Sequence, residues 1–187
     1  MILGGFDLET TGLDFNDHRI IEISLILYHW PSRRELLNFT RRIYPGRSID
    51  PKAQAVHRIA LEDLEGCPTF EQMAEQVNKI LAKCNVLVAH NAMSFDVPFL
   101  AAELNRVKQP VPTHLSVVDT LDSRWATPDG KKPKLMELAF ALGVDYDTEQ
   151  AHAAEYDVRV MMECLFRGID MGFFALPNQE SEDHQAA

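Results

Sequence analysis

Two acidic side chains interrupt an apolar segment near the N-terminus, where Asp7 and Glu9 lie two positions apart in the stretch GGFDLETTG, residues 4–12. Residues 2–8 are typical of a strand, and side chains two positions apart on a strand point to the same face. Carboxylates are costly to bury unless they are paired or hold a metal, and two close carboxylates repel each other. The segment is therefore either the solvated end of a strand or a strand that delivers both acids to a cation.

Strand and helix patterns alternate along the rest of the chain. Strands are expected at residues 2–8, 19–30, 35–44, 85–90 and 115–122. Helices are expected in a short stretch before residue 60 and at residues 69–84, 94–107, 135–143 and 155–166. In the second strand a period of two places four apolar residues on one face: Ile21, Ile23, Leu25 and Leu27. This order of elements predicts an α/β fold, a mixed β-sheet flanked by helices.

Length and composition predict one domain with a proper core, since 46% of the 187 residues are hydrophobic. We expect this domain at residues 1–176, followed by a disordered polar tail at residues 177–187. No apolar run approaches the roughly 20 residues that span a bilayer, and no secretory signal is recognisable. The three cysteines are widely spaced and lack metal-ligand spacing, which favours a reducing compartment. The sequence therefore predicts a cytoplasmic protein with no membrane partner.

The net charge of −10 argues against a generic nucleic-acid binder, which usually carries a basic surplus. It does not exclude a nuclease, because a bound divalent cation inverts the electrostatics of an acidic site. A small basic patch can also contact phosphates while the rest of the chain stays negative.

Three further residues are candidates for the same site. Asp96 follows the strand at residues 85–90, and ligands of open α/β sheets gather beyond the carboxyl ends of strands; the alternative is an acid favoured by a helix dipole. His152 lies five residues before Asp157, which is about 140° around a helix, so His152 belongs on the loop before the helix if the two act together. The alternative for His152 is a loop histidine without a role.

Taken together, the four acids form a ligand set of carboxylate oxygens suited to Mg²⁺ or Mn²⁺. Two such cations about 4 Å apart can clamp the attacking and leaving oxygens of a phosphodiester. An aspartyl phosphatase also begins with acids on its first strand, but its second acid is an aspartate, whereas Glu9 stands here.

Three motifs occur in order: FDLETTG at residues 6–12, HNAMSFD at residues 90–96 and HAAEYD at residues 152–157. They resemble the motifs of the DEDDh (DnaQ-like) 3′–5′ exonucleases, a family that includes the proofreading epsilon subunit of the bacterial replicative polymerase. The resemblance spans residues 3–166 and implies an RNase H-like fold. It also implies hydrolysis of the 3′-terminal phosphodiester with release of nucleoside 5′-monophosphates. Two ions, Mg²⁺ or Mn²⁺, would be held by Asp7, Glu9, Asp96 and Asp157, and His152 would be the general base.

The resemblance suggests substrate-binding residues as well. Thr10 and Thr11 are expected near the terminal 3′-OH, and Leu13 near the terminal base. His57 is expected beside the substrate strand, and Asn91 either orients substrate or holds a turn. For Leu13 the alternative is an ordinary core or surface leucine, and for His57 it is an ordinary surface position.

Basic residues around the loop at residues 126–134 are expected either to contact the nucleic-acid backbone or to be solvated: Arg124, Lys131, Lys132 and Lys134. Arg58 stands where the family often has glycine, and it either adds a phosphate contact or has no role.

The substrate remains open between two polymers. LETTG, residues 8–12, looks more like the DNA-directed members of the family than the LEMTG of oligoribonucleases, which favours 3′ ends of single-stranded or frayed DNA. An RNase T-like or oligoribonuclease-like exoribonuclease, or an inactive nucleic-acid-binding scaffold, is the alternative. Since only about twenty residues follow the last helix, a stand-alone nuclease is favoured over a polymerase-bound subunit, although a polymerase partner stays open.

Overall fold

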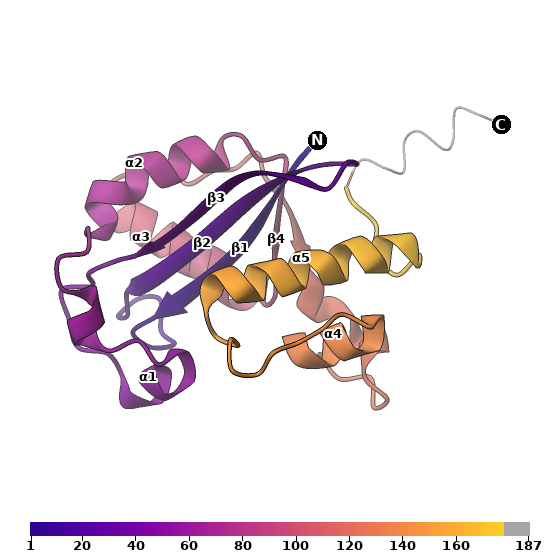
Figure 1. The fold of residues 1–187 in the computed structure, drawn as a ribbon. Coiled ribbons are helices and arrows are strands. Elements are labelled where there is room, and N and C mark those ends of the chain that lie inside the picture. The colour runs from indigo at the N-terminus through magenta and orange to yellow at the C-terminus, as the bar shows by residue number, and fades with distance from the viewer. Residues whose placement is uncertain (178–187) are drawn as a thin grey trace.

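A computed structural model describes residues 1–177, in which a five-stranded sheet carries helices on both faces (Figure 1). The first three strands are β1 (Ile2–Thr10), β2 (Ile20–His29) and β3 (Arg34–Arg42), and they pair antiparallel. The last two are β4 (Val86–Ala89) and β5 (Ser116–Asp119), which run parallel to β1. The strand order is β3-β2-β1-β4-β5. Its antiparallel and parallel pairs confirm the predicted mixed sheet.

Helices lie on both faces of this sheet and at one end of it (Figure 1). Helices α2 (Phe70–Leu81) and α3 (Val97–Arg106) cover one face. Helices α4 (Leu135–Leu142) and α5 (Ala154–Asp170) lie on the other, and the short α1 (Pro51–His57) lies near the end of the first three strands. A π-helical turn at Ala92–Asp96 leads from β4 into α3. Shorter 3₁₀ turns occupy Leu61–Leu64, Thr120–Asp122 and Arg124–Ala126.

The alternation of side chains along β1 decides where its acids point. Phe6 and Leu8 belong to the core under α2 and α3. Gly5 faces α5, and a Cβ atom there would lie 2.7 Å from side-chain atoms of Val158 and Met162. Asp7 is two residues from Gly5 and Glu9 is four, so both acids face the α5 side of the sheet.

One prediction for β2 is wrong. The β1–β2 register pairs Glu9 with Glu22 and Thr10 with Ile20, so Ile21 is an extra residue in a β-bulge. Ile21 packs in a separate small cluster with Ile59 and Leu64, whereas Ile23, Leu25 and Leu27 do share the predicted face. The strand is also buried on both faces, because helices cover both. Glu22 is the register partner of Glu9 and therefore points to the same side of the sheet.

The remaining elements follow the prediction with small shifts at their ends. The last helix is longer than predicted, since α5 reaches Asp170. Apart from Pro177, the predicted tail at residues 177–187 lies outside the described residues. Within residues 1–177, no helix combines the length and the apolar character that crossing a membrane requires.

Candidate active site

Three separate elements bring four acids to one place on the α5 side of the sheet. Asp7 and Glu9 come from the last half of β1, Asp96 ends the π-helical turn after β4, and Asp157 lies in the first turn of α5. Asp96 is 2% exposed and Glu9 is 9% exposed. The pKa of the Asp7 carboxyl responds to Asp96, Glu9 and Asp157, so their charges lie close together.

Burial and mutual repulsion both disfavour the ionised forms of these acids. Burial raises the pKa of Asp7 well above its ordinary range, and the neighbouring carboxylates raise it further. Burial, then Asp157, Glu22 and Asp96, raise the pKa of Glu9 to about 9. Burial also raises the pKa of Asp96 and Asp157; Asp119 adds to the rise at Asp96, and the His152 backbone N–H opposes it at Asp157. The cluster therefore needs positive charge to hold its carboxylates ionised.

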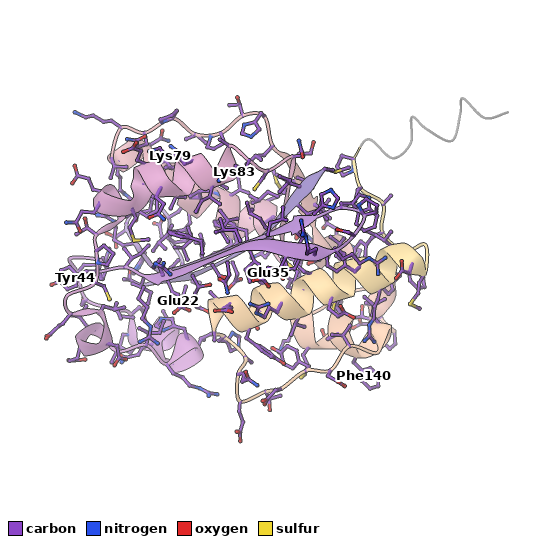
Figure 2. All side chains as sticks on the ribbon, turned by 45° about the horizontal axis from the view of Figure 1, so that its top comes forward. Glu22, Glu35, Tyr44, Lys79, Lys83 and Phe140 are labelled. Carbon is purple, nitrogen blue, oxygen red and sulfur yellow. The ribbon has the colours of Figure 1, made fainter. Side chains whose placement is uncertain are left out.

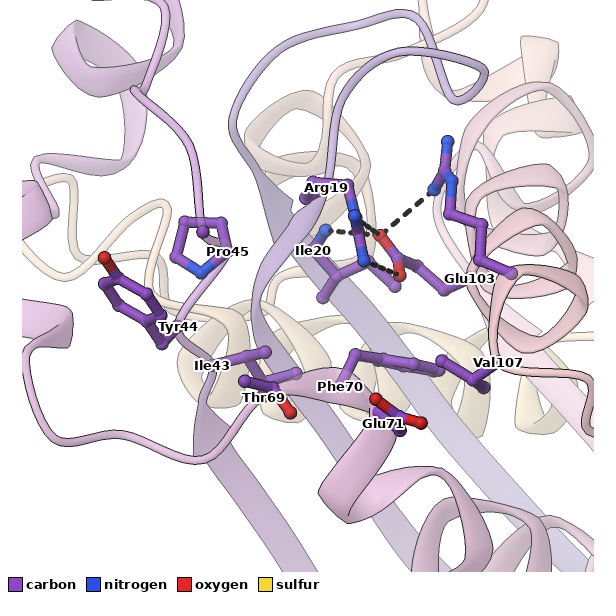
Figure 3. A pocket seen from close by; sticks show the side chains of 12 residues that line it. Arg19, Ile20, Ile43, Tyr44, Pro45, Thr69, Phe70, Glu71, Glu103 and Val107 are labelled. Atoms are coloured by element: carbon purple, nitrogen blue, oxygen red, sulfur yellow. Dashed lines mark hydrogen bonds and ion pairs between the residues drawn. The ribbon is translucent and has the colours of Figure 1, made fainter.

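A buried acid elsewhere shows what a structural carboxylate looks like in this fold. Glu103 of α3 is fully buried beside a cavity of about 440 Å³ on the other face of the sheet (Figure 3). Two guanidinium groups neutralise it: Arg19 Nε lies 2.7 Å and Arg106 Nη1 lies 3.1 Å from its Oε1 atom. Within residues 1–177, by contrast, none of the four clustered acids forms an ion pair with lysine or arginine.

His152 lies on the loop before α5, as the five-residue spacing predicts. Its backbone is left-handed, with φ of 66°, and its N–H donates to Asp157 Oδ2 at 3.1 Å. One potential ligand atom each from Glu9, His152 and Asp157 lie within 4.8 Å of one another. Asp157 Oδ1 is buried and has no hydrogen-bond partner among residues 1–177. A buried carboxylate oxygen that has no partner and lies close to other acids suits a hard divalent cation as a ligand.

Two hollows open beside the acids. The central cavity, of about 740 Å³, is lined by Asp7, Asn91, His152 and Asp157 among others. A side pocket of about 350 Å³ is lined by Glu9 and by mostly apolar residues, including Leu13, Val56 and Phe95. The acids thus separate an open cavity from a smaller and more apolar pocket.

A family model described as an exonuclease (RNase_T) matches residues 5–165, which is most of the chain. The chain belongs to this exonuclease family. The DNA polymerase III subunit epsilon of Treponema pallidum is 37% identical over 162 residues, which are 84% of this chain and 72% of that one. These findings confirm the predicted DEDDh (DnaQ-like) membership, and with it an enzyme of the 3′–5′ exonuclease class.

Solved structures agree on the fold. Exonuclease I of E. coli in complex with a dA16 oligonucleotide matches 90% of this chain with a TM-score of 0.78 at 17% identity. A 3′-exonuclease structure described as showing 3′-end specific recognition of a histone mRNA stem-loop matches 91% of the chain with a TM-score of 0.74 at 18% identity. The chain spans 41% of the exonuclease I chain and 82% of the other. The RNase H-like fold is therefore confirmed.

The predicted substrate-binding residues of this exonuclease divide between the two hollows. Thr10, Leu13 and His57 line the side pocket, and Leu13 stands at its rim with 83% of its surface exposed. His57 Nδ1 accepts the Ile59 N–H, whereas its buried Nε2 has no hydrogen-bond partner among residues 1–177. Asn91 lines the central cavity and holds a turn in left-handed conformation, with φ of 87°.

The expectation for Thr11 needs correction. Thr11 is fully buried, and its hydroxyl bonds to His18 Nδ1 and accepts the Arg19 N–H. Its own N–H and carbonyl are bonded to the backbone of Arg19 and Asp50. Thr11 therefore holds the loop after β1 and has no polar group left for a substrate. The hydroxyl of Thr10 is likewise used inside the protein, since it donates to the Gly12 carbonyl at 2.8 Å.

Three residues of the site were not predicted. Glu22 lies opposite Glu9 across β1 and β2, and its Oε2 accepts the Ala154 N–H at the start of α5 (Figure 2). The sequence signal for Glu22 was an acid inside an apolar strand, which is the same signal that pointed to Asp7. Tyr146 lines the central cavity, and burial followed by Asp157 raises the pKa of its phenol to about 12.

Asp119, at the end of β5, is the third. Its carboxylate accepts the N–H groups of Asn91, Met93 and Leu121 at 2.9–3.1 Å. It thereby fixes the turn that ends in Asp96. An acid at the end of a predicted strand was the available signal.

Arg58 reaches the same cavity from the end of α1. Its backbone is left-handed, with φ of 61°, which explains why glycine suits this position. Its Nη1 donates to the Glu149 carbonyl at 3.3 Å, on the segment that leads to His152. The side chain thus lines the central cavity together with Asp7, His152 and Asp157.

Proposed function

We propose that this exonuclease hydrolyses the 3′-terminal phosphodiester of DNA with the help of two divalent cations, Mg²⁺ or Mn²⁺, and that residues 1–176 form the catalytic domain. The observation that carries the proposal is the cluster of four acids without a lysine or arginine partner among residues 1–177, with one orphaned oxygen on Asp157. Nucleoside 5′-monophosphates are the product.

The ligands of the cations would be Asp7, Glu9, Asp96 and Asp157. Their oxygen donors suit hard cations. The positive charge of the divalent cations offsets the mutual repulsion that raises the pKa values of these acids. When bound, the cations stabilise the negative charge that develops on the phosphoryl oxygens and favour ionisation of the attacking water.

His152 would take the proton from that water. Its imidazole is exposed on a loop at the edge of the acids, within reach of both the cavity and solvent. A neutral imidazole accepts a proton near pH 7, and the positioned base contributes about 10²–10⁴-fold in rate. The backbone N–H bond to Asp157 ties the base to the acid cluster.

The side pocket would hold the terminal nucleoside. Its volume of about 350 Å³ and its apolar lining suit one base and sugar, with Leu13 against the base and the free His57 Nε2 directed to a polar group. Thr10 forms the wall next to Glu9. The rest of the strand then leaves through the central cavity, where Asn91 and Arg58 stand.

DNA is favoured over RNA by the relatives, since the Treponema pallidum protein is a DNA polymerase III subunit. This relationship also makes a polymerase the first partner to test. RNA remains the second candidate, because a structural neighbour of the same fold is a 3′-exonuclease that recognises a histone mRNA stem-loop.

The test uses 5′-labelled single-stranded DNA and RNA of equal sequence, each with Mn²⁺ and with EDTA. A metal-dependent ladder that shortens from the 3′ end of DNA is expected. The Asp157→Asn variant should show no ladder, whereas Asp170→Asn, at the other end of α5, serves as the matched control. Selective shortening of RNA would replace the substrate but keep the chemistry, and no shortening of either would contradict the proposal.

A further inference from the structure

A groove continues the central cavity along the outer side of α4. This outer groove has a volume of about 740 Å³ and is lined by residues of α4 and of the loop before it: Ala126, Thr127, Pro128, Asp129, Lys131, Lys132, Lys134, Met136, Glu137 and Phe140. Lys132, Lys134 and Met136 also line the central cavity. The outer groove and the central cavity therefore adjoin at these three residues.

The apolar part of the outer groove is unusually exposed. Phe140 is 88% exposed and Met136 is 44% exposed, and they stand four positions apart on the same side of α4. Phe140 therefore adds little to the core. An exposed ring beside a nuclease site offers a face on which any base can stack, whatever the sequence.

The polar part of the outer groove favours phosphate. Three lysines and two acids line the groove, and a third acid, Asp122, pairs with Lys132, so the groove is locally close to neutral in a chain whose net charge is −10. Lys131 pairs with Asp129 at 2.6 Å and Lys132 pairs with Asp122 at 2.9 Å, both in exposed ion pairs of the weak kind that a phosphate can replace. Lys134 has no ion pair among residues 1–177. Glu137 is engaged by the Lys134 backbone N–H at 2.7 Å.

The loop that carries the three lysines, residues 131–134, is held beside the active site. His90 follows β4, and its Nε2 lies 3.0 Å from the Pro133 carbonyl while its Nδ1 lies 2.9 Å from Thr120 Oγ1. This bridge holds the segment between Lys132 and Lys134 beside the central cavity. The lysines are therefore placed before any ligand arrives.

We propose that the outer groove binds the nucleotides upstream of the scissile phosphodiester. Bases stack on Phe140 and Met136, and the phosphates between them pair with the lysines. This inference rests on the proposed function, because it assigns the groove to the polymer whose 3′ end lies at the acids. The wall shared with the central cavity, the cluster of three lysines and the exposed Phe140 ring favour a nucleic-acid strand over a protein as the occupant.

The experiment uses two residues that line the outer groove and not the central cavity. The full chain with Phe140→Ala or Lys131→Gln is assayed with Mn²⁺ on a 16-nucleotide single-stranded DNA and on a dinucleotide, which ends before the groove. For Phe140→Ala, the ratio of kcat/KM on the long substrate to that on the short one should fall about tenfold, because a stacked base is lost. Phe140→Tyr should retain the wild-type ratio. For Lys131→Gln, the slope of log(kcat/KM) against log[salt] should weaken by about 0.7 on the long substrate, as expected for one lost phosphate contact.

Matched controls come from α2 and β3, which do not line the outer groove. Lys79, like Lys83, lies on the side away from Phe140, and it is 71% exposed in an ion pair with Glu75 (Figure 2). Lys79→Gln therefore controls for charge, and Leu36→Ala, at a 42% exposed position of β3, controls for an apolar truncation. Both controls should keep the wild-type ratio and slope.

The outcomes separate this inference from the proposed function. Wild-type ratios and slopes in both groove variants would overturn the inference and leave hydrolysis intact. If the ratios and slopes are unchanged and a protein partner binds the wild type but not Phe140→Ala, the groove is a protein-binding surface. This outcome would also overturn the inference. A wild-type protein that cleaves neither substrate would contradict the proposed function, and the inference with it.

Discussion

At the residue scale, the site is distinguished by four clustered acids that form no ion pair with lysine or arginine among residues 1–177. Glu103 is buried as deeply as Asp96, yet two arginines neutralise it. Asp7 and Glu9 have no lysine or arginine ion pair among residues 1–177, and burial raises the pKa of both. A buried acid that is paired with arginines, as Glu103 is, needs no ligand. A cluster of buried acids without such a partner stabilises the fold only when a cation is bound. The two kinds of buried acid therefore differ in purpose, although their burial is similar.

His152 is expected to act on the proton and not on the cation. The His152→Ala variant should lower kcat by about 10²–10⁴-fold, because a positioned base is lost. Its affinity for Mn²⁺, measured by calorimetry on the same preparation, should stay within a few-fold of the wild type. A large loss of Mn²⁺ affinity would show that His152 is a ligand instead.

Arg58 combines a strained backbone with a place in the central cavity. A left-handed conformation costs an ordinary residue about 1 kcal/mol, so Arg58→Gly should keep or slightly raise the free energy of unfolding. The same change should lower kcat/KM about tenfold, because a guanidinium leaves the path of the phosphates. Thermal unfolding and hydrolysis of a labelled oligonucleotide measure the two effects.

Arg33 supplies the control for this substitution. It has the same left-handed backbone, with φ of 56°, but pairs with Asp170 far from the acids. Arg33→Gly should leave kcat/KM unchanged. Equal losses of activity in both variants would show that the effect of Arg58 is not local.

At the scale of elements, the approach of α5 to β1 assembles the site. Gly5 permits this approach, and a Cβ atom there would lie 2.7 Å from Val158 and Met162. Gly5→Ala should therefore push α5 away from the sheet and move Asp157 from Asp7. We expect a loss of about 1–3 kcal/mol in the free energy of unfolding, and at least a tenfold loss of kcat in protein that is still folded.

Gly4 is the neighbouring control on the other face of β1. A Cβ atom added at Gly4 would lie 2.8 Å from Cys84 Sγ, so Gly4→Ala should lower the free energy of unfolding by a similar amount. That clash lies under the α2 side, away from the acids. If Gly4→Ala lost as much kcat per folded molecule as Gly5→Ala, the distance between β1 and α5 would not be the cause.

The sequence predicted the elements well where a single period ran through them. The helices and the position of His152 before α5 followed from spacing, and the mixed sheet followed from the order of the elements. Ile21 could not be placed, because a β-bulge shifts the period by one residue and leaves no local mark in the sequence. Thr11 was misassigned for a similar reason: its partners His18 and Arg19 come from the far side of a loop. Contacts that cross a loop or a bulge depend on register, which only the assembled sheet fixes.

At the scale of the whole molecule, stability and catalysis are coupled through protons. In the metal-free protein Glu9 keeps its proton up to a pKa of about 9, whereas the unfolded chain releases it near the ordinary value of about 4.3. The folded state therefore binds more protons than the unfolded state between these values. Its free energy of unfolding must fall as pH rises across this window, by about 1.4 kcal/mol per pH unit for each proton retained.

Histidines act in the opposite direction only at lower pH. Burial lowers the pKa of His57 and His90, so their contribution rises with pH and is complete near their unfolded value of about 6.5. A comparison between pH 7 and pH 8.5 therefore reports on the acids, with a smaller contribution of the same sign from Cys84 and Cys164, because burial raises the pKa of both thiols to about 12. We expect the Tm of the metal-free protein to fall over this range.

Divalent cations should reverse this fall. They bind ionised carboxylates of the folded state, so the rise in Tm on adding saturating Mg²⁺ should be larger at pH 8.5 than at pH 7. Differential scanning calorimetry in EDTA and in Mg²⁺ measures both slopes, with Asp170→Asn expected to behave like the wild type. Asp7→Asn should flatten the metal-free slope and lose most of the Mg²⁺ effect, because it removes one charge from the repelling cluster and one ligand from the cation. A wild-type Tm that is flat with pH and gains equally from Mg²⁺ at both values would mean that the acids are already ionised without metal, and that their burial is offset by some other positive charge.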